Sequence, residues 1–343
     1  MTDDVLRGAV IGCGFFAQNH LNAWNNIEGV KLVAVCDRDA DKAKAAAARF
    51  GVPAWYTDAA EMFERESLEF VDIATTMPTH RMLVELAARH AVPTVVQKPF
   101  APTWDDCIAM VAACKTAGVP LMVHENFRFQ TPLNAVRQVI ESGAIGEPHF
   151  GRVSFRTGYD IIAGQPYLAK EEQFIILDLG IHVLDMARVY FGEAETVYCQ
   201  TQRIRPNVRA EDMATMLLRH RSGATSIVDC SYSTWIKPDN FPQTLVHIEG
   251  TRGGVRLIEG YRMLVTSDGE TSETDVSAPA LPWTIPPWHT AQASVLNTQR
   301  HWIECLRNRT APQTSGEDNL RTYALVVAAY RSAAERRAVA PVI

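Results

Sequence analysis

The stretch from Ile175 to Met186 places three ionisable residues at helical spacing among apolar neighbours. Asp178, His182 and Asp185 are four and three residues apart, so a helix would carry them on one face. A carboxylate beside an imidazole can orient the ring for proton transfer, and the pattern therefore predicts a general base. The alternatives are that Asp178 caps the helix and that Asp185 is simply exposed. Because the trio has a single histidine and no further ligand motif, we expect no metal site.

A glycine-rich hexapeptide, Gly12 to Ala17, directly follows the first apolar run, residues 9–11. Gly12 allows a tight turn, Gly14 lets a pyrophosphate approach the backbone, and Ala17 lets the following helix pack closely on the strand. The N–H groups at the helix start would then bind the phosphates. Packing alone can also require small residues here. However, Asp37 lies 20 residues after Ala17, where an acid that binds the ribose belongs, and the two features together predict dinucleotide binding.

The residues at the end of the second expected strand bear on the choice of cofactor. Asp37 can bond both ribose hydroxyls of NAD, and its charge repels the 2′-phosphate of NADP. Arg38 keeps NADP open as the less favoured cofactor, because an arginine can pair with that phosphate; the alternative is a solvated residue at a helix start. The sequence therefore predicts a preference for NAD.

Lys98 follows the fifth expected strand, residues 94–96. The carboxyl ends of parallel strands form the edge at which open α/β sheets bind ligands. Partial burial beside the cationic nicotinamide would make Lys98 a candidate proton donor or acceptor. The alternative is a surface lysine in a loop.

The elements that must hold these residues change in character near residue 127. Up to that point, short β-rich runs alternate with helical patterns, which is the signature of a doubly wound parallel α/β sheet of Rossmann type. Its expected strands are residues 9–11, 31–36, 54–56, 70–74, 94–96 and 121–124. Long alternating runs then predict an α+β domain with a large, mostly antiparallel open sheet. Its expected strands are residues 148–158, 196–205, 213–219, 224–233, 244–249 and 254–266, and its expected helices are about 175–190, 291–307 and 317–334.

The change of pattern predicts two domains. We expect a dinucleotide-binding domain over residues 1–125 and a substrate and oligomerisation domain over residues 126–343, with C-terminal helices able to pack back on the first domain. Two helix starts carry a capping box, Thr103 with Asp106 and Ser315 with Asp318, and Gly118 is expected to end the first of these helices.

The composition limits the class of protein. The 343 residues suggest two domains, and 47% apolar with 21% charged residues is ordinary for a globular chain. A net charge of −6 with interleaved acids and bases argues against nucleic acid as a partner. Seven cysteines without a C-x-x-C pair suit a reducing cytoplasm, and no apolar run approaches the roughly 18 residues that span a bilayer. We therefore expect a cytoplasmic protein with no membrane partner.

The alternating apolar residues of the second-domain strands also bear on assembly. A sheet covered by helices on one face leaves its other face to be buried. We expect a homodimer or homotetramer that pairs through this sheet.

Together, these motifs resemble those of the Gfo/Idh/MocA family, named after glucose-fructose oxidoreductase, inositol dehydrogenase and a rhizopine-catabolism protein. The resemblance covers nearly the whole chain: the Gly12 to Ala17 motif, Asp37, Lys98-Pro99, Asn126-Phe127-Arg128-Phe129, the Asp178/His182 pair and the stretch from Thr314 to Asp318. It implies that Lys98, Asp178 and His182 form the catalytic group and contact the substrate, and that Arg128 and Asp185 help hold substrate hydroxyls. It also implies a cis peptide bond before Pro99.

The resemblance further implies a cofactor site, with the stretch from Thr75 to His80 on the nicotinamide side. The expected cofactor residues are Gly12, Gly14, Phe15, Phe16, Ala17, Asp37, Arg38, Thr75, Thr76, Pro78, His80, Gln97, Lys98 and Asn126. Two positions depart from the family pattern: Gln97 replaces the usual Glu, and Thr76-Met77 replaces Pro-Asn. Gln97 can still bond a ribose hydroxyl but carries no charge.

We therefore expect an NAD-dependent dehydrogenase that oxidises a secondary or anomeric hydroxyl of a sugar or polyol, with branched aldoses and inositols included. His182, oriented by Asp178 and aided by Lys98, would accept the hydroxyl proton. The alternatives are a redox-assisted glycosidase that retains NAD, and a non-catalytic NAD-sensing regulator. A Pro/Trp-rich loop, residues 279–288, is either a lid that stacks Trp283 on the sugar or a junction with buried tryptophans.

Overall fold

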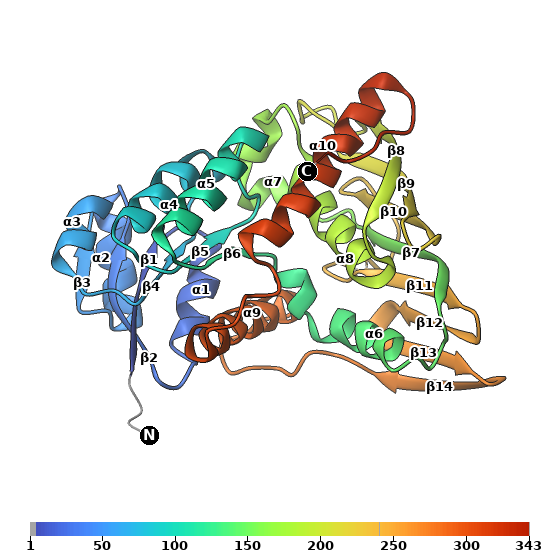
Figure 1. Ribbon diagram of the computed structural model, residues 1–343, viewed down its shortest axis with the longest axis horizontal. Helices are drawn as coiled ribbons and strands as arrows, with labels where there is room; N and C mark the ends of the chain where they lie inside the picture. Colours follow the sequence, from blue (N-terminus) through green and yellow to red (C-terminus); the bar gives the residue numbers. More distant parts are fainter. Residues whose placement is uncertain (1–4, 240, 343) are drawn as a thin grey trace. The chain divides into compact units, whose positions relative to one another are not determined.

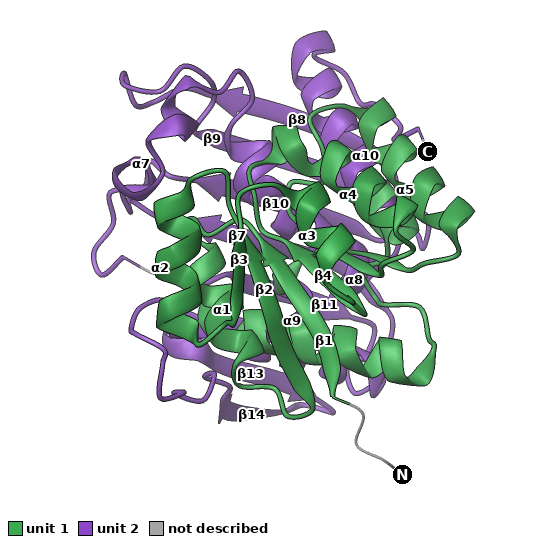
Figure 2. Cartoon of the chain, turned by 90° about the vertical axis from the view of Figure 1, so that its left-hand side faces the viewer, with its two compact units in different colours: residues 1–126, 292–320 green, residues 127–291, 321–343 purple. Residues whose placement is uncertain are grey.

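The computed structural model describes residues 5–239 and 241–342, which form two compact units. The first unit contains the chain up to residue 126 together with residues 292–320, and the second contains residues 127–291 and the chain from residue 321 on. Figure 2 colours the two units, and the first includes most of the penultimate helix. Each unit is built around one sheet.

The sheet of the first unit is parallel, with strand order β3-β2-β1-β4-β5-β6. The strands are β1 (Leu6–Ile11), β2 (Val30–Cys36), β3 (Ala54–Tyr56), β4 (Phe70–Ile73), β5 (Thr94–Gln97) and β6 (Leu121–His124). The connecting helices are α1 (Ala17–Trp24), α2 (Ala40–Phe50), α3 (Ala59–Arg65), α4 (His80–Arg89) and α5 (Trp104–Ala117) (Figure 1). The strand order reverses between β1 and β4, so the carboxyl ends of these strands flank the crevice where doubly wound sheets bind ligands. The expected α/β doubly wound fold is confirmed.

Apolar packing brings a distant helix into this unit. Trp24, Phe70 and Trp302 are almost fully buried in one cluster, and the Trp24 and Phe70 ring centroids lie 4.6 Å apart. Trp302 belongs to helix α9 (His289–Asn308). Burial of such large side chains supplies the main driving force for attaching α9 to the unit.

Helix ends form where the sequence predicted them. The Thr103 hydroxyl accepts the Asp106 N–H at 3.1 Å and donates to the Asp106 carboxylate at 2.7 Å. Gly118 ends α5 at a φ of 68°, a left-handed conformation that glycine adopts without a steric penalty. The Ser315 hydroxyl likewise accepts the Asp318 N–H at the start of α10 (Gly316–Glu335), whose residues from 321 on belong to the second unit.

The second unit contains an eight-stranded sheet of order β14-β13-β12-β11-β7-β10-β9-β8, in which only β7 and β10 pair in parallel. Its strands are β7 (Pro148–Arg156), β8 (Ala194–Gln202), β9 (Met213–His220), β10 (Thr225–Ser231), β11 (Leu245–Gly250), β12 (Gly253–Ile258), β13 (Arg262–Ser267) and β14 (Glu270–Asp275). Helices α6 (Thr131–Glu141) and α8 (Ile181–Phe191) pack on this sheet, and a short helix, α7 (Ile161–Gly164), follows β7. The expected α+β domain is confirmed.

Two details of this sheet differ from the sequence analysis. The single strand expected over residues 254–266 is wrong: β12 and β13 form a hairpin whose turn contains Gly260 at a φ of 74°. Strand β14 was not expected, because all six of its residues are polar and exposed. Such a strand has no apolar face and therefore no alternating pattern in the sequence. It pairs with β13 through the backbone and through polar side chains, with Thr266 bonded to Thr271 at 2.9 Å and Arg262 paired with Glu273.

Candidate active site

The turn from β1 into α1 has the backbone that a dinucleotide loop needs. Gly12 has a φ of 101°, and a Cβ atom there would lie 2.7 Å from the Ala74 carbonyl oxygen. A Cβ added at Gly14 would meet no atom within 4 Å, so the space above this residue is open. Ala17 is buried against the sheet. The loop is thus tight where it contacts the protein and open where a pyrophosphate would approach the backbone.

Asp37 lies directly after β2, beside this turn. Its carboxylate accepts the Cys13 N–H at 2.8 Å through Oδ2 and the Asp39 N–H at 2.9 Å through Oδ1. The side chain is half-buried, and the remaining lone pairs of both oxygens are suited to ribose hydroxyls. Arg38, the next residue, is exposed, as is Phe15 in the loop before α1.

The segment expected beside the nicotinamide forms a turn and then enters α4. The Thr79 hydroxyl donates to the Thr75 hydroxyl at 2.8 Å, while Thr76 and Pro78 are exposed. His80 is fully buried, and its two ring nitrogens lie 3.1 Å from the Thr75 and Phe100 carbonyl oxygens. Burial lowers the pKa of His80. His80 therefore ties the turn after β4 to the segment after β5.

The ends of β5 and β6 carry the remaining cofactor candidates. Gln97 is buried, Lys98 is half-buried, and the peptide bond between Lys98 and Pro99 is cis, as the family resemblance implied. The Gln97 amide oxygen accepts the Lys98 backbone N–H at 2.7 Å. Asn126, after β6, donates its amide N–H to the Ser294 hydroxyl at 2.7 Å.

In the second unit, Asp178 lies in a five-residue π-helical turn, Ile176–Gly180, that leads directly into α8. Such wide turns are rare and often occur at functional sites. The Tyr232 hydroxyl donates to Asp178 Oδ2 at 3.0 Å. Burial, together with the Asp178 carboxylate, raises the pKa of Tyr232 well above its usual range, so Tyr232 remains a donor that fixes this carboxylate.

His182 lies on the first turn of α8 and is almost fully buried. Its ring stacks on the Phe127 ring with a centroid distance of 4.0 Å and an interplanar angle of 3°. Phe127 belongs to the Asn126-Phe127-Arg128-Phe129 segment that the sequence analysis singled out. The stacking fixes the plane of the imidazole.

Asp185 does not have the open carboxylate that a substrate-binding residue would present. It is fully buried; Oδ2 accepts the Arg128 Nε–H at 2.6 Å, and Oδ1 accepts from Arg128 at 2.7 Å, Arg188 at 3.3 Å and Thr322 at 2.5 Å. Burial by itself would raise the pKa of Asp185, but Arg128 and then Arg188 lower it below its usual value. The charged carboxylate thus holds Arg128 in place.

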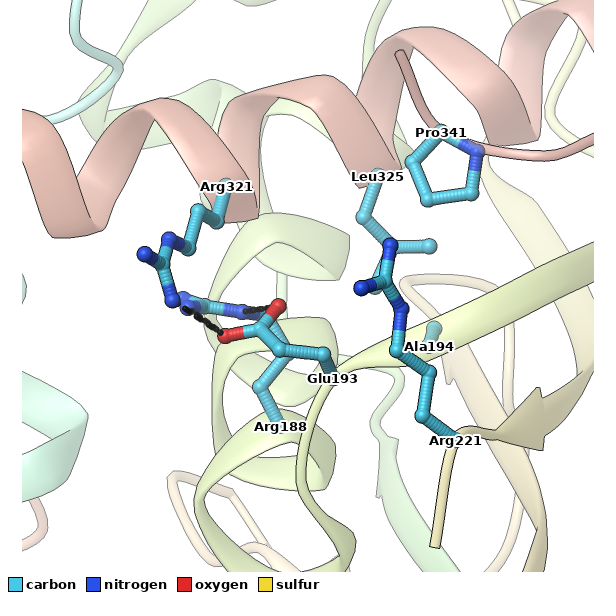
Figure 3. A pocket seen from close by; sticks show the side chains of 7 residues that line it. All are labelled: Arg188, Glu193, Ala194, Arg221, Arg321, Leu325 and Pro341. Carbon is cyan, nitrogen blue, oxygen red and sulfur yellow. Dashed lines mark hydrogen bonds and ion pairs between the residues drawn. The ribbon is translucent and has the colours of Figure 1, made fainter. Parts of the chain in front are cut away.

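Arg188 extends this ion-pair network toward the surface. Its guanidinium donates to Glu193 at 2.7 and 3.1 Å, and Arg321 donates to the same carboxylate at 3.4 Å. Figure 3 shows Glu193 between these two arginines, with Arg221 nearby. These residues line a cavity of about 200 Å³. The sequence analysis missed Arg188, Thr322 and Tyr232, because nothing in their local sequence marks them.

The Pro/Trp-rich loop is anchored within the second unit. The Trp288 ring packs edge-on against Phe241 and Tyr159, with centroid distances of 4.8 and 5.6 Å. The Trp283 indole N–H is buried and has no hydrogen-bond partner among the described residues. Trp288 therefore has a structural role, while Trp283 retains an unused donor.

The part of the chain that the structure describes lacks two further features. No group of three or more His, Cys, Asp or Glu side chains there is arranged to hold a metal ion. No described helix is long and apolar enough to cross a membrane.

Comparison with known proteins identifies the family of both halves of the chain. Residues 6–125 match the oxidoreductase family with an NAD-binding Rossmann fold, and residues 133–256 match the GFO/IDH/MocA C-terminal domain. A D-apiose dehydrogenase of Paraburkholderia graminis is 53% identical over 97% of this chain and 89% of its own length. A second D-apiose dehydrogenase, from Rhizobium rhizogenes, is 52% identical over 97% of both chains.

The comparison with solved structures agrees. A crystal structure of an oxidoreductase from Agrobacterium radiobacter in complex with NAD+, L-tartaric acid and magnesium is 52% identical, covers 98% of each chain and superposes with a TM-score of 0.97. The NAD-binding family, the two-unit fold and the open turn at Gly14 all agree with the sequence-based prediction. The chain belongs to the Gfo/Idh/MocA family and is an NAD-dependent dehydrogenase that acts on a hydroxyl group of a sugar or polyol.

Proposed function

We propose that the substrate is a branched aldose of the D-apiose type and that its anomeric hydroxyl is oxidised. The observation that supports this choice is the identity of 53% and 52% with two D-apiose dehydrogenases, each over 97% of this chain. The related myo-inositol 2-dehydrogenase of Thermotoga maritima is only 26% identical over a similar length. The branched aldose is therefore the better-supported substrate class.

In this proposal, Lys98, Asp178 and His182 form the catalytic group. NAD, when bound, takes up the hydrogen and the electron pair that leave the carbon of the C–OH group. His182 accepts the hydroxyl proton, and the carbon–oxygen single bond becomes a carbonyl. Stacking on Phe127 holds the imidazole plane, Tyr232 holds the Asp178 carboxylate, and Lys98 polarises the reacting oxygen.

The cofactor would be held mainly by the turn after β1 and by Asp37. The open space at Gly14 fits a pyrophosphate, and Asp37 has lone pairs for ribose hydroxyls. The remaining proposed contacts come from Phe15, Phe16, Ala17, Arg38, Thr75, Thr76, Pro78, His80, Gln97, Lys98 and Asn126. His80 and Gln97 would contribute by shaping the backbone around them, since their side chains are already bonded to protein groups.

The substrate would be held by Lys98, Arg128, Asp178, His182 and Trp283. Asp185 enters this set in a changed role: it acts through Arg128, because its oxygens are bonded inside the protein. Trp283 is supported by its buried N–H, which can donate to a sugar oxygen.

We also propose a homodimer or homotetramer that pairs through the outer face of the second sheet. This face is less apolar than the sequence suggested. Arg152 and Arg156 pair with Asp229 at 2.7 and 3.2 Å, while Leu217 is about half exposed. A mixed surface of this kind fits an interface with a polar rim.

The roles of the two domains and the cellular location are also part of the proposal. We propose that residues 1–125 bind the dinucleotide and that residues 126–343 serve substrate binding and assembly, with residues 292–320 belonging structurally to the first unit. A cytoplasmic location is supported by seven cysteines that are all free and buried. No nucleic-acid or membrane partner is proposed.

A screen of candidate substrates tests the activity. D-apiose, common aldoses, myo-inositol and aryl glycosides are each incubated with the protein and NAD or NADP, and reduced cofactor is read by its absorbance. We expect reduced cofactor in proportion to D-apiose, with NAD preferred. Release of an aglycone without net reduced cofactor would instead identify the redox-assisted glycosidase, and NAD binding without turnover of any sugar would identify the regulator.

A further inference from the structure

A polar cluster is buried in the first unit directly behind the Gln97-Lys98 segment. His20 on α1, Asp72 on β4 and Gln299 on α9 have no exposed surface, and Gln97 at the end of β5 has 7%. His20 Nδ1 lies 2.7 Å from Asp72 Oδ2, and His20 Nε2 lies 2.9 Å from the Gln97 amide nitrogen. The cluster thus links a buried carboxylate, through an imidazole, to the residue before Lys98.

The donors around Asp72 keep it charged. The Trp24 indole N–H donates to Asp72 Oδ2 at 2.7 Å, and the Gln299 amide donates to the same oxygen at 3.3 Å. Burial by itself would raise the pKa of Asp72, but His20, then the nearby His124 and the Trp24 donor, lower it below its usual value. All three donors bond Oδ2, whereas Oδ1 is buried with no hydrogen-bond partner among the described residues. Because a buried carboxylate is costly without such donors, the three donors to Oδ2 are held firmly.

The direction of each hydrogen bond between Asp72 and the Lys98 backbone can be assigned. The Lys98 backbone N–H can only donate, so the group of Gln97 that faces it at 2.7 Å must be the amide oxygen. The Gln97 NH₂ group then faces His20 Nε2, and because an amide nitrogen can only donate, this ring nitrogen must accept. The proton of the ring is therefore on Nδ1, where it is donated to Asp72.

We propose that His20 and Asp72 are positioning residues for the dehydrogenase reaction. Asp72 fixes the His20 tautomer, His20 holds the Gln97 amide, and Gln97 holds the Lys98 backbone. We call this series of contacts the relay. The proposal rests on the proposed role of Lys98, which is to polarise the reacting oxygen. A misplacement of about 1 Å in a reacting group can cost about 100-fold in rate, so a fixed backbone at Lys98 has a kinetic value.

Gln97 and an Nδ1-protonated His20 form a matched pair. A glutamate at this position would present only acceptors, and His20 could bond it only by carrying a second proton, on Nε2. Gln97→Glu should therefore convert His20 into an imidazolium, whereas the parent protein should show the neutral Nδ1–H form. Nitrogen-15 NMR distinguishes these species, and the His20 signal among ten histidines is assigned by its absence from a His20→Asn variant.

Two substitutions at His20 separate the two halves of the relay. In His20→Asn, the amide nitrogen takes the place of Nδ1 and can still donate to Asp72, but nothing reaches Gln97. In His20→Gln, the amide oxygen takes the place of Nε2 and can still accept from Gln97, but the bond to Asp72 is lost. We expect His20→Asn to lower kcat about 10- to 100-fold and His20→Gln to retain more turnover. NAD affinity should change less than about threefold in both variants.

Trp24→Phe is the matched control. It removes another 2.7 Å donor to Asp72 from the same helix, one turn further on, but Trp24 has no bond to Gln97. We expect a lower melting temperature with kcat unchanged. If kcat in His20→Asn and Trp24→Phe falls in proportion to stability, the role is structural and the inference is overturned.

A double mutant tests whether the relay acts through Lys98. In a Lys98→Met background, His20→Asn should lower kcat by less than about twofold, because the group it positions is gone. A full His20→Asn effect in that background would overturn the inference, since His20 would then act on another group. Failure of the proposed function looks different: Lys98→Met by itself would retain full turnover. An Nε2–H tautomer of His20 in the parent protein would reject the relay whatever the kinetics.

Discussion

The buried Asp185 network predicts a large loss of stability when one charge is removed without a change of shape. Asp185→Asn keeps the side-chain volume but removes the buried counter-charge of Arg128 and Arg188, whose side chains are 9% and 5% exposed. Removing one partner of a buried ion pair costs about 3–5 kcal/mol. For a unit of this size, that corresponds to a fall in melting temperature of about 6–20 °C.

The measurement is urea unfolding followed by circular dichroism, with Arg321→Gln as the control. Arg321 is 51% exposed and bonds Glu193 at 3.4 Å, so its removal should cost less than about 1 kcal/mol. Asp185→Asn should also raise the KM for the sugar, because Arg128 loses its support, while NAD affinity is unchanged. The reasoning is refuted if the free energy of unfolding of Asp185→Asn lies within about 1 kcal/mol of that of the parent protein.

The dependence on pH gives a second check. The pKa of Asp185 is lowered in the folded protein, so its contribution is fully present above the unfolded-state value of about 3.9 and is lost as the pH falls through the folded-state value. The difference in free energy of unfolding between the parent protein and Asp185→Asn should therefore be constant between about pH 6 and 8 and shrink only in acid. A difference that grew on acidification would contradict the assignment of a charged Asp185.

Three further predictions concern the cofactor and the catalytic group. His182→Ala should lower kcat by about 10²–10⁴-fold with NAD affinity within a few-fold, and Asp178→Asn should cost less; near-normal turnover of His182→Ala would remove it as the base. Asp37→Ala should weaken NAD and erode the preference over NADP in kcat/KM, and equal efficiency with both cofactors in the parent would contradict its role. Gly12→Ala should fold poorly, because its Cβ would press on a backbone carbonyl. Gly14→Ala should fold normally but bind NAD weakly in a fluorescence titration. Equal effects of the two substitutions on folding and on NAD binding would reject the loop assignment.

The features that could be predicted from the sequence are those encoded by neighbouring residues. The Thr103/Asp106 box and Gly118 fix both ends of α5, since each cap needs residues only a few positions apart. The turn at Gly12 could be predicted for the same reason, and the acid at Asp37 from its fixed spacing of 20 residues after Ala17. By contrast, β12 and β13 merged into one expected strand, because the turn glycine, Gly260, lies in a run that alternates on both sides.

The site network could not be predicted in this way, because its partners are far apart in the sequence. Helical spacing predicted one face of one helix for Asp178, His182 and Asp185, and the structure divides them between a π-helical turn and α8. Spacing also does not show whether a helix face meets solvent, substrate or protein. Arg128 is 57 residues from Asp185, and Thr322 is 137 residues away. A charged residue among apolar neighbours indicates that partners exist, and the fold determines which they are. His20 and Asp72 carry the same signal, a polar residue between apolar positions of a strand or helix, and by that criterion they could have been found from the sequence as residues in need of donors and acceptors.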